Sequence, residues 1–317
     1  MSEPLRPPAG FRIGHWSNPD ARTGCTVVIA PEGSRGGVDV RGGGPGTRET
    51  DVIGPLAGTD RVSAVVFAGG SAYGLAAADG VMHWLEERGI GYPTPAGVVP
   101  IVPAAIVYDL AAGDARARPD AVAGRAACDD AFEGVPERGR VGAGCGTAAG
   151  KVLGREHAAD AGVGYAAATG ATGVRVAALA VANPFGDVIA ADGTALAVAR
   201  RPDGTEVRAA EAIMGMEGPP EWTQARIAGN TTLVCVMTDA TLGKADCARV
   251  ARAAAAGIAR AVEPVFTDVD GDVVFCLASG QGEPAGRFEV LQLQTLAASV
   301  TAEAIRDGAL EADSSRN

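Results

Sequence analysis

The stretch Ala228-Gly229-Asn230-Thr231-Thr232-Leu233-Val234-Cys235-Val236-Met237 decides how the rest of the chain is interpreted. It begins with small and polar residues, continues with two threonines, and then becomes an apolar, β-branched run that predicts a buried central strand over 233–238. A cut between Asn230 and Thr231 would leave Thr231 with a free α-amine beside its own hydroxyl. Such a pair supplies a nucleophile and its base together. The stretch therefore predicts a self-cleaving chain with a threonine nucleophile.

Two features flank this stretch. A polar segment over 200–226, interrupted by Gly and Pro, leads into it, and we expect a mobile linker that suits a processing site. Further on, Asp270-Gly271-Asp272 separates the apolar runs 265–269 and 273–278, which is typical of a hairpin turn between paired strands. The functional alternative is a carboxylate pair near Thr231, in which one aspartate holds the amine and the other relays a proton.

A glycine cluster over 139–151 looks at first like a phosphate-binding loop. Cys145 stands where that loop requires its first glycine, and Val152 replaces the hydroxyl residue that binds magnesium. We therefore expect no nucleotide. Instead, the backbone amides and Lys151 are expected to line a pocket for developing negative charge, with Gly144 as a substrate-pocket residue. The alternative is a solvated lysine that caps a turn.

Another glycine cluster, over 41–51, ends in the charged residues Arg48, Glu49 and Asp51. It has too much glycine for a helix or a strand. The charged end favours an ordered loop held by ion pairs, and the alternative is an ordinary surface loop.

Two further polar side chains are candidates for the site. Asn183 closes the apolar run 174–182, where an Asn is commonly a turn former but can also donate its side-chain N–H to an oxyanion. The glycine-rich turn over 69–74 follows an apolar strand and leads into a helix. There Ser71 is expected as the helix N-cap, and Tyr73 as a pocket wall or hydrogen-bond donor.

Composition restricts the class of protein. The chain has 317 residues, 47% of them hydrophobic, and a net charge of −11, which argues against nucleic acid or an anionic membrane as a partner. It shows no secretory signal and no run long enough to cross a bilayer, so a cytoplasmic location is expected. Six scattered cysteines without a CxxC pair are expected to be small core residues, and neither a metal nor a cofactor is expected.

Taken in order, these segments resemble the DmpA-type aminopeptidases, also called the L-aminopeptidase/D-esterase family, which includes β-aminopeptidases and nylon-oligomer (6-aminohexanoate oligomer) hydrolases. The matching segments cover nearly the whole chain: 24–33, 42–51, 69–89 with 99–110, 141–151, 183–187, 230–244 and 270–280. The resemblance implies an α/β fold of the αββα layered kind found in N-terminal nucleophile hydrolases, with mixed or antiparallel sheets between helix layers. It also implies a single domain cut into 1–230 and 231–317, and a homo-oligomer, with a tetramer as the candidate size.

The resemblance also assigns roles. It places the family's catalytic residues on five positions: the cleaved nucleophile on Thr231, the oxyanion-type asparagine on Asn183, the lysine on Lys151, and the two aspartates of the nylon-hydrolase branch on Asp270 and Asp272. It implies a hydrolase of small linear amides, most of all 6-aminohexanoate oligomers or N-terminal peptide residues, that cuts itself after Asn230. The alternatives are a broad aminopeptidase or β-aminopeptidase without nylon-oligomer activity, an ornithine acetyltransferase-like acyl transferase, and a binding scaffold without catalysis.

Overall fold

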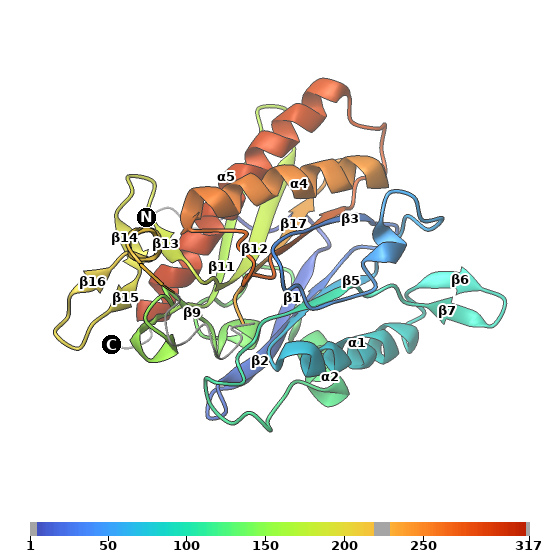
Figure 1. The fold of residues 1–317 in the computed structure, drawn as a ribbon. Helices are drawn as coiled ribbons and strands as arrows, with labels where there is room; N and C mark the ends of the chain where they lie inside the picture. The colour runs from blue at the N-terminus through green and yellow to red at the C-terminus, as the bar shows by residue number, and fades with distance from the viewer. Residues whose placement is uncertain (1–4, 219–228, 315–317) are drawn as a thin grey trace.

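The computed structural model describes residues 5–218 and 229–314. Two five-stranded sheets pack face to face, and a pair of helices covers the outer side of each sheet (Figure 1). Apolar side chains of the two sheets meet in the middle, where the rings of Phe67 and Phe275 lie 6.1 Å apart. This layering confirms the predicted αββα fold.

The first sheet, called sheet 1, is formed by the N-terminal part of the chain. From edge to edge it contains β1 (Arg12–Asn18), β2 (Thr23–Ile29), β5 (Ala64–Ala68), β8 (Ala104–Ile106) and β4 (Thr47–Arg48). Its outer face packs against α1 (Ala77–Glu86) and α2 (Ala121–Asp130).

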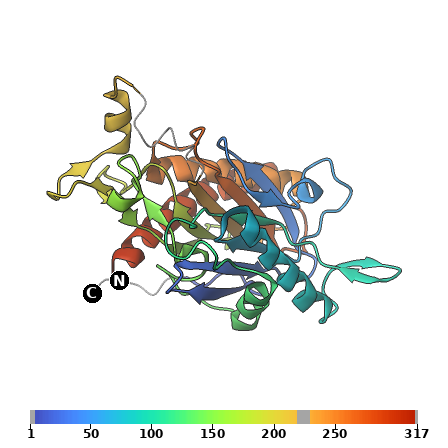
Figure 2. The ribbon, with the colours of Figure 1, turned by 60° about the horizontal axis from the view of Figure 1, so that its bottom comes forward.

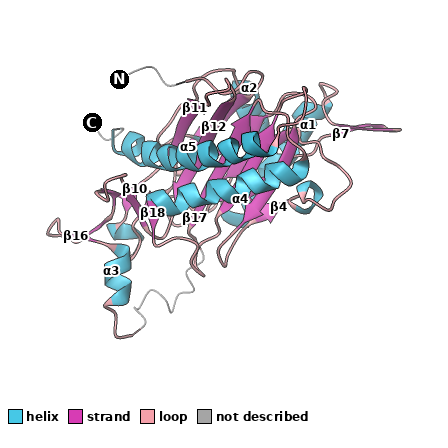
Figure 3. Cartoon of the chain, turned by 90° about the horizontal axis from the view of Figure 1, so that it is seen from above, coloured by secondary structure: helices cyan, strands magenta, loops and turns pink. Residues whose placement is uncertain are grey.

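The second sheet, called sheet 2, carries the stretch on which the sequence analysis began. From edge to edge it contains β11 (Val163–Thr169), β12 (Arg175–Asn183), β17 (Thr231–Thr238), β19 (Val273–Ala278) and β3 (Arg35–Val40). The helices α4 (Lys244–Ala261) and α5 (Arg287–Ser314) lie side by side across its outer face (Figure 3).

The remaining elements are short. They are β6 (Tyr92–Thr94) with β7 (Gly97–Val99), β9 (Ala148–Ala149) with β10 (Ala159–Asp160), β13 (Asp187–Ile189) with β14 (Ala195–Ala197) and β18 (Val262–Glu263), β15 (Ala199–Arg200) with β16 (Glu206–Val207), and helix α3 (Ala209–Met214). The described chain also contains four short 3₁₀ helices: η1 (Asp51–Ile53), η2 (Ser71–Ala76), η3 (Gly142–Gly144) and η4 (Arg155–His157). The β6–β7 hairpin projects from the body of the molecule (Figures 1 and 2).

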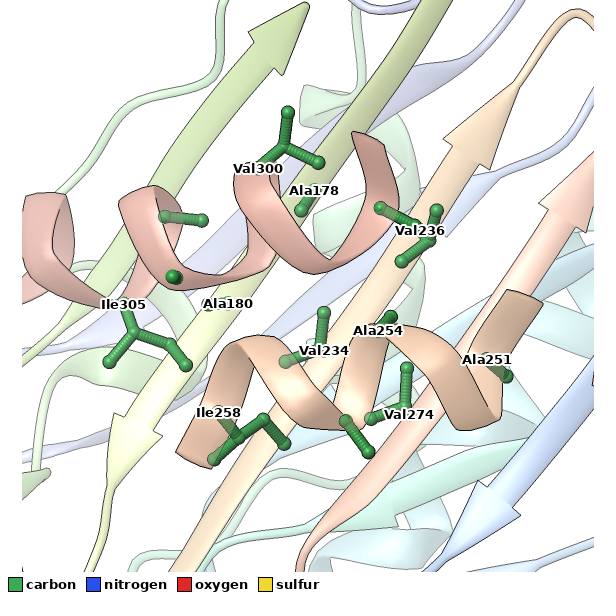
Figure 4. Close-up of a cluster of buried hydrophobic side chains, with 14 of the residues drawn as sticks. Ala178, Ala180, Val234, Val236, Ala251, Ala254, Ile258, Val274, Val300 and Ile305 are labelled. Atoms are coloured by element: carbon green, nitrogen blue, oxygen red, sulfur yellow. The ribbon is translucent and has the colours of Figure 1, made fainter. Parts of the chain in front are cut away.

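Strand β17 is central and buried on both faces, as its apolar run predicts. Alternate side chains point to opposite faces of a strand. Leu233 and Met237 therefore enter the core between the sheets, while Val234 and Val236 pack against α4 and α5 (Figure 4). The helices meet this face largely through alanine and valine, which explains how a chain with only 4% aromatic residues fills its core.

The pairing of β17 brings three chain segments together beside the first residue of this strand, at one end of the strands of sheet 2. Its partner β12 is antiparallel, so Asn183 at the end of β12 lies opposite Thr231 at the start of β17. Its other partner β19 is parallel, and Leu233 pairs with Val273. The residues just before β19 therefore lie at the same end of the strands as Thr231.

Two local expectations are wrong. Residues 265–269 form no strand, so Asp270-Gly271-Asp272 is not a hairpin turn, and Asp270 instead forms an isolated parallel bridge with Asn230. The hairpin signal is overridden because β19 finds long-range partners in β17 and β3. Ser71 is not a side-chain N-cap either, since it begins η2 with a left-handed φ of 55°.

The structure also decides several looser expectations. The charged end of the 41–51 cluster is ordered, with Arg48 Nη1 2.6 Å from Asp79 Oδ1 and Glu49 accepting a hydrogen bond from the Val102 N–H at 2.9 Å. The expectation that the cluster contains no strand is wrong at Thr47–Arg48, because these residues pair with β8 as strand β4. The expected linker over 200–226 has regular structure in its described part, which includes strand β16 and helix α3. Its residues 219–226 lie outside the described chain. All six cysteines are buried free thiols. Within the described residues, no helix has both the length and the apolar character needed to cross a bilayer.

Candidate active site

Thr231 is the first residue of β17 and its side chain is enclosed, with only 3% of the residue exposed. Its hydroxyl Oγ1 donates a hydrogen bond of 2.6 Å to the carbonyl oxygen of Asn230. The hydroxyl therefore lies against the peptide bond at which the sequence predicts the cut. A central strand holds it rigidly there, since β17 is hydrogen-bonded on both sides.

The carbonyl of Asn230 has a second donor, the backbone N–H of Gly271 at 2.8 Å. Two donors thus converge on one oxygen, at distances typical of groups that stabilise an oxyanion. The side chain of Asn230 is also fixed, because its Nδ2 donates to the carbonyl of Val269 at 3.1 Å. Backbone groups of the 267–272 turn, which leads into β19, thus hold the carbonyl of the peptide bond at which the cut is predicted.

Asn183 lies on the other side of the same segment. Its Nδ2 donates to the carbonyl oxygen of Gly229 at 2.9 Å, one residue before the predicted cut. Its Oδ1 accepts from the Ala148 N–H at 3.2 Å and from Lys151 Nζ at 2.8 Å. Because two donors face Oδ1, the amide can only turn its NH₂ toward Gly229. The side-chain N–H of Asn183 therefore faces the segment at the predicted cut, but in the uncut chain it binds the Gly229 carbonyl and not that of Asn230.

Lys151 is buried and not a solvated turn cap. Its Nζ donates to both Asn183 O and Asn183 Oδ1 at 2.8 Å, and lies 3.5 Å from Gly229 O. Burial lowers the pKa of Lys151 well below its usual range, and the charge of Arg155 lowers it further, while Asp270 and Asp272 act in the opposite direction. Lys151 therefore fixes the Asn183 amide, and it loses its proton at a lower pH than an exposed lysine does.

The two aspartates have different surroundings. Asp270 is fully engaged, because Oδ1 accepts from the Phe185 N–H at 3.1 Å and Oδ2 accepts from the N–H and hydroxyl of Thr267 at 3.1 and 2.5 Å. Asp272 Oδ1 accepts from the Thr232 N–H at 2.5 Å, whereas its Oδ2 is buried and makes no hydrogen bond within the described residues. Asp270 thus ties two loops together, whereas Asp272 Oδ2 makes no hydrogen bond of standard geometry within the described residues.

The pKa of Asp272 is unusual. Burial, reinforced by the neighbouring charge of Asp270, raises it from 3.8 to about 7. The Thr232 and Phe266 N–H groups and the Thr232 hydroxyl lower it, but by less than burial raises it. Asp272 is therefore a carboxyl group that gains and loses a proton near neutral pH, which is the property expected of a proton carrier.

The glycine cluster over 41–51, to which the sequence analysis gave no role in the site, supports this turn. The N–H of Arg41 donates to Asp272 O at 2.7 Å, and the N–H of Gly44 donates to Asp270 O at 2.9 Å. Gly42 has a left-handed φ of 76°, and a Cβ there would lie 2.2 Å from Asp270 O. Only glycine allows so close an approach of the two backbones.

The remaining candidate residues lie outside this network. Tyr73 is 61% exposed, with the guanidinium of Arg118 3.7 Å from its ring centre, and no hydrogen bond among the described residues joins it to Thr231. Gly144 is buried in η3, where a Cβ would meet the Val163 N–H at 2.5 Å. The aromatic residue that does reach the site is Tyr108, whose ring would lie 3.0 Å from a Cβ placed on Gly229. Tyr108 lies in the matching segment 99–110, but no residue pattern there marked it as a site residue.

Comparison with known proteins agrees with this geometry. Residues 9–317 match the profile of peptidase family S58. An uncharacterised aminopeptidase of Mycobacterium leprae is 43% identical over 89% of this chain and 80% of its own length. The chain belongs to peptidase family S58. A second relative, the 6-aminohexanoate-oligomer endohydrolase of an Agromyces strain, is 32% identical over 96% of this chain and 84% of its own length.

A solved structure supports the fold. The L-aminopeptidase D-Ala-esterase/amidase of Ochrobactrum anthropi, described as a variant of the N-terminal nucleophile hydrolase fold, superposes with a TM-score of 0.69 at 17% identity, covering 97% of this chain and 88% of that one. This S58 protein is therefore an amide-bond hydrolase with that fold, as the sequence predicts. The assignment favours hydrolysis over the acyl transferase and binding-scaffold alternatives. Within the described residues, no group of three or more His, Cys, Asp or Glu side chains is placed to hold a metal ion.

Proposed function

We propose that this S58 hydrolase cuts itself between Asn230 and Thr231, and that the released Thr231 is the nucleophile of the mature enzyme. One observation carries the proposal: Thr231 Oγ1 lies 2.6 Å from the carbonyl oxygen of Asn230, which the Gly271 N–H also binds. Nucleophile, target carbonyl and oxyanion donor are thus assembled in the uncut chain. The products are 1–230 and 231–317.

The self-cleavage begins with attack by Thr231 Oγ1 on the carbonyl carbon of Asn230. Negative charge develops on the carbonyl oxygen, where the Gly271 N–H stabilises it. The C–N bond between the two residues then breaks, an ester forms, and the hydroxyl proton ends on the new α-amine. Water hydrolyses the ester, which gives Asn230 a carboxylate and restores the Thr231 hydroxyl.

Asp272 is the proposed proton carrier for this step. Its pKa of about 7 suits proton transfer at neutral pH, and its Oδ2 accepts no hydrogen bond of standard geometry from the described chain. Asp270 is instead a positioning residue, since hydrogen bonds occupy both of its oxygens. The two aspartates therefore divide the roles that the sequence analysis left open between them.

In the mature enzyme the α-amine of Thr231 is the base. Its reference pKa of roughly 7.7–8.0 lets it accept the hydroxyl proton near neutral pH. Oγ1 attacks the substrate amide, and the Gly271 N–H and the Asn183 amide stabilise the oxyanion. An acyl-enzyme forms as the amine product leaves, and water releases the acid. Lys151 keeps Asn183 oriented and gains a proton most readily when negative charge develops beside it.

The substrates that we propose are small linear amides and peptides. The S58 assignment supports an amide, and the endohydrolase relative supports oligoamides such as 6-aminohexanoate oligomers. We also propose that the enzyme acts in the cytoplasm as a homo-oligomer, with a tetramer as the candidate size. Light scattering on the purified protein gives the mass of the assembly.

Activity of matched variants tests the nucleophile. Thr231→Ala should abolish hydrolysis of amino-acid p-nitroanilides, peptide amides and 6-aminohexanoate oligomers, while Thr231→Ser should keep part of it. Thr238→Ala is the matched control, because Thr238 is a buried threonine at the other end of the same strand and takes no part in the proposed chemistry. Equal loss in Thr231→Ala and Thr238→Ala, or full activity in Thr231→Ala, would contradict the proposal.

A further inference from the structure

The β6–β7 hairpin leaves the body of the molecule as a projecting arm and forms a two-stranded sheet of its own (Figures 1 and 2). A hairpin of two strands is only marginally stable by itself in water. Residues 89–100, which include the whole hairpin, contain no Asp, Glu, Lys, Arg or His, although 21% of the chain is charged. Exposed strands usually carry charges that keep other molecules away. The composition of the arm is therefore typical of a segment that a partner covers.

An exposed apolar pair lies at the base of the arm. Tyr92 of β6 and Val99 of β7 are register partners, so their side chains lie on the same face of the hairpin. They are 45% and 47% exposed. The tip of the arm is instead closed by its own hydrogen bonds, since the Thr94 hydroxyl donates to the carbonyl of Gly97 at 2.8 Å and accepts from the Ala96 N–H at 3.2 Å. The surface that calls for a partner is thus the base and not the tip.

A groove of about 280 Å³ runs between β7 and helix α1 beside this pair. Val98, Val99 and Met82 contribute apolar walls, and His83 and Glu86 contribute polar groups. An aromatic side chain with a polar end, such as tyrosine, suits a groove of this kind, because its ring meets the apolar walls and its hydroxyl meets the polar groups. The chain thus carries a tyrosine and a groove fitted to a tyrosine next to each other.

A second copy of this chain is the partner that fits this arrangement. Two copies related by a twofold axis present the same patch to each other, so each tyrosine can enter the groove of the other copy. The net charge of −11 makes identical copies repel, and the uncharged arm is a surface where they can approach with little repulsion. Pro93 has no N–H to offer a new strand, which favours contact through the face of the hairpin over addition of a strand to β6.

We propose that the β6–β7 hairpin is a contact between two copies of this chain, in which Tyr92 of each copy enters the groove between β7 and α1 of the other. This inference rests on the proposed homo-oligomer and names the surface that forms it. A buried tyrosine at the centre of such a contact is the kind of residue on which association depends most. Tyr92→Asp would place a carboxylate in each groove beside Glu86, and the twofold axis would repeat this cost in both copies.

Light scattering on three purified proteins tests the proposal, after far-UV circular dichroism has established that each is folded. The wild-type protein should have the mass of at least two copies of the chain, and Tyr92→Asp should lower that mass at least about twofold. Leu310→Asp is the matched control and should keep the wild-type mass. Leu310 is also exposed, at 56%, and it belongs to the C-terminal end of α5, on the opposite side of the molecule from the arm (Figure 1).

Three results would overturn the inference. Tyr92→Asp with the wild-type mass would show that the arm makes no contact between copies. An equal loss of mass in Leu310→Asp would show that any added charge is enough to separate the copies. A monomeric wild-type protein that sediments with phosphatidylcholine vesicles, while Tyr92→Asp does not, would show that the arm binds a membrane instead.

The same samples separate this inference from the proposed function. An oligomer that Tyr92→Asp leaves intact contradicts only the placement of the contact, whereas a monomeric wild-type protein also contradicts the proposed homo-oligomer. Intact mass of each sample reports self-cleavage independently of its assembly. A cut protein without the arm contact therefore leaves Thr231 as the proposed nucleophile.

Discussion

Replacing Asp272 by Asn should change how the stability of the protein depends on pH. Asp272 is 2% exposed, and its pKa is about 7 in the folded chain against 3.8 for an unperturbed aspartate. The folded chain therefore binds more protons than the unfolded chain between about pH 4 and pH 7. The free energy of unfolding falls as pH rises through this range, and Asp272→Asn should remove that part of the fall.

The magnitude follows from the width of the pH range. A measurement from pH 4.5 to pH 8 covers about 2.5 pH units of the range in which the folded chain binds the extra proton, and each unit corresponds to about 1.36 kcal/mol. Between pH 4.5 and pH 8, the free energy of unfolding of the variant minus that of its parent should therefore rise by about 3 kcal/mol. The Asn side chain keeps an oxygen for the Thr232 N–H, so the hydrogen bond to Asp272 Oδ1 is preserved in kind.

Urea unfolding of two uncut proteins measures this difference. The parent is Thr231→Ala, which the proposed mechanism predicts to stay uncut, and the test protein is Thr231→Ala with Asp272→Asn. Groups with a shifted pKa that Asp272 does not influence, such as Asp187 and His15, contribute equally to both proteins and cancel in the difference. Parallel stability curves across the whole pH range would show that the Asp272 carboxyl is not held protonated, and would refute its assignment as a proton carrier.

Three further substitutions test other parts of the site. Lys151→Met should slow both self-cleavage and amide hydrolysis by about tenfold to a hundredfold, because Asn183 loses a buried donor to Oδ1, and unchanged rates would show that Lys151 does not orient the amide. Asn183→Ala should lower kcat by about 10²–10³ on an anilide substrate, as for loss of other oxyanion donors, and a change in KM alone would contradict that role. Gly42→Ala should lower the free energy of unfolding by about 1–3 kcal/mol and delay self-cleavage, because its Cβ would lie 2.2 Å from the backbone at Asp270. Gly44→Ala is the matched control, since a Cβ there has no neighbour nearer than 3.9 Å, and equal effects of the two glycine variants would rule out the contact as the cause.

The single strands and helices could be predicted because they carry clear local patterns, whereas the αββα layering was implied by the resemblance to the DmpA-type aminopeptidases. The apolar, β-branched run of β17 indicated a strand buried on both faces, and the structure places it at the centre of sheet 2. The candidate residues Thr231, Asn183 and Lys151 could be named because hydroxyl, amide and ammonium groups are the ones that the proposed chemistry needs. These residues meet at one end of the strands of sheet 2 because of the strand order, which local patterns do not determine.

The parts that the sequence did not reveal depend on backbone groups and long-range pairing. The Gly271 N–H is the donor to the Asn230 carbonyl, and no side-chain identity marks a backbone amide for that role. The support from the 41–51 cluster is also made by backbone hydrogen bonds. Asp270-Gly271-Asp272 has a true local preference for a hairpin, but the parallel pairing of β17 with β19 determines its conformation instead. Tyr108 reaches Gly229 from a distant segment, in which no residue pattern marked it as a site residue.

The intact mass of the purified wild-type protein, with N-terminal sequencing of its fragments, tests the central claim most directly. The account predicts two chains whose masses sum to that of the full chain plus one water, with the smaller chain beginning at Thr231. Thr231→Ala should give one uncut chain under the same conditions. A single uncut wild-type chain that hydrolyses amides at full rate, or a small chain that begins at Thr232, would contradict the account.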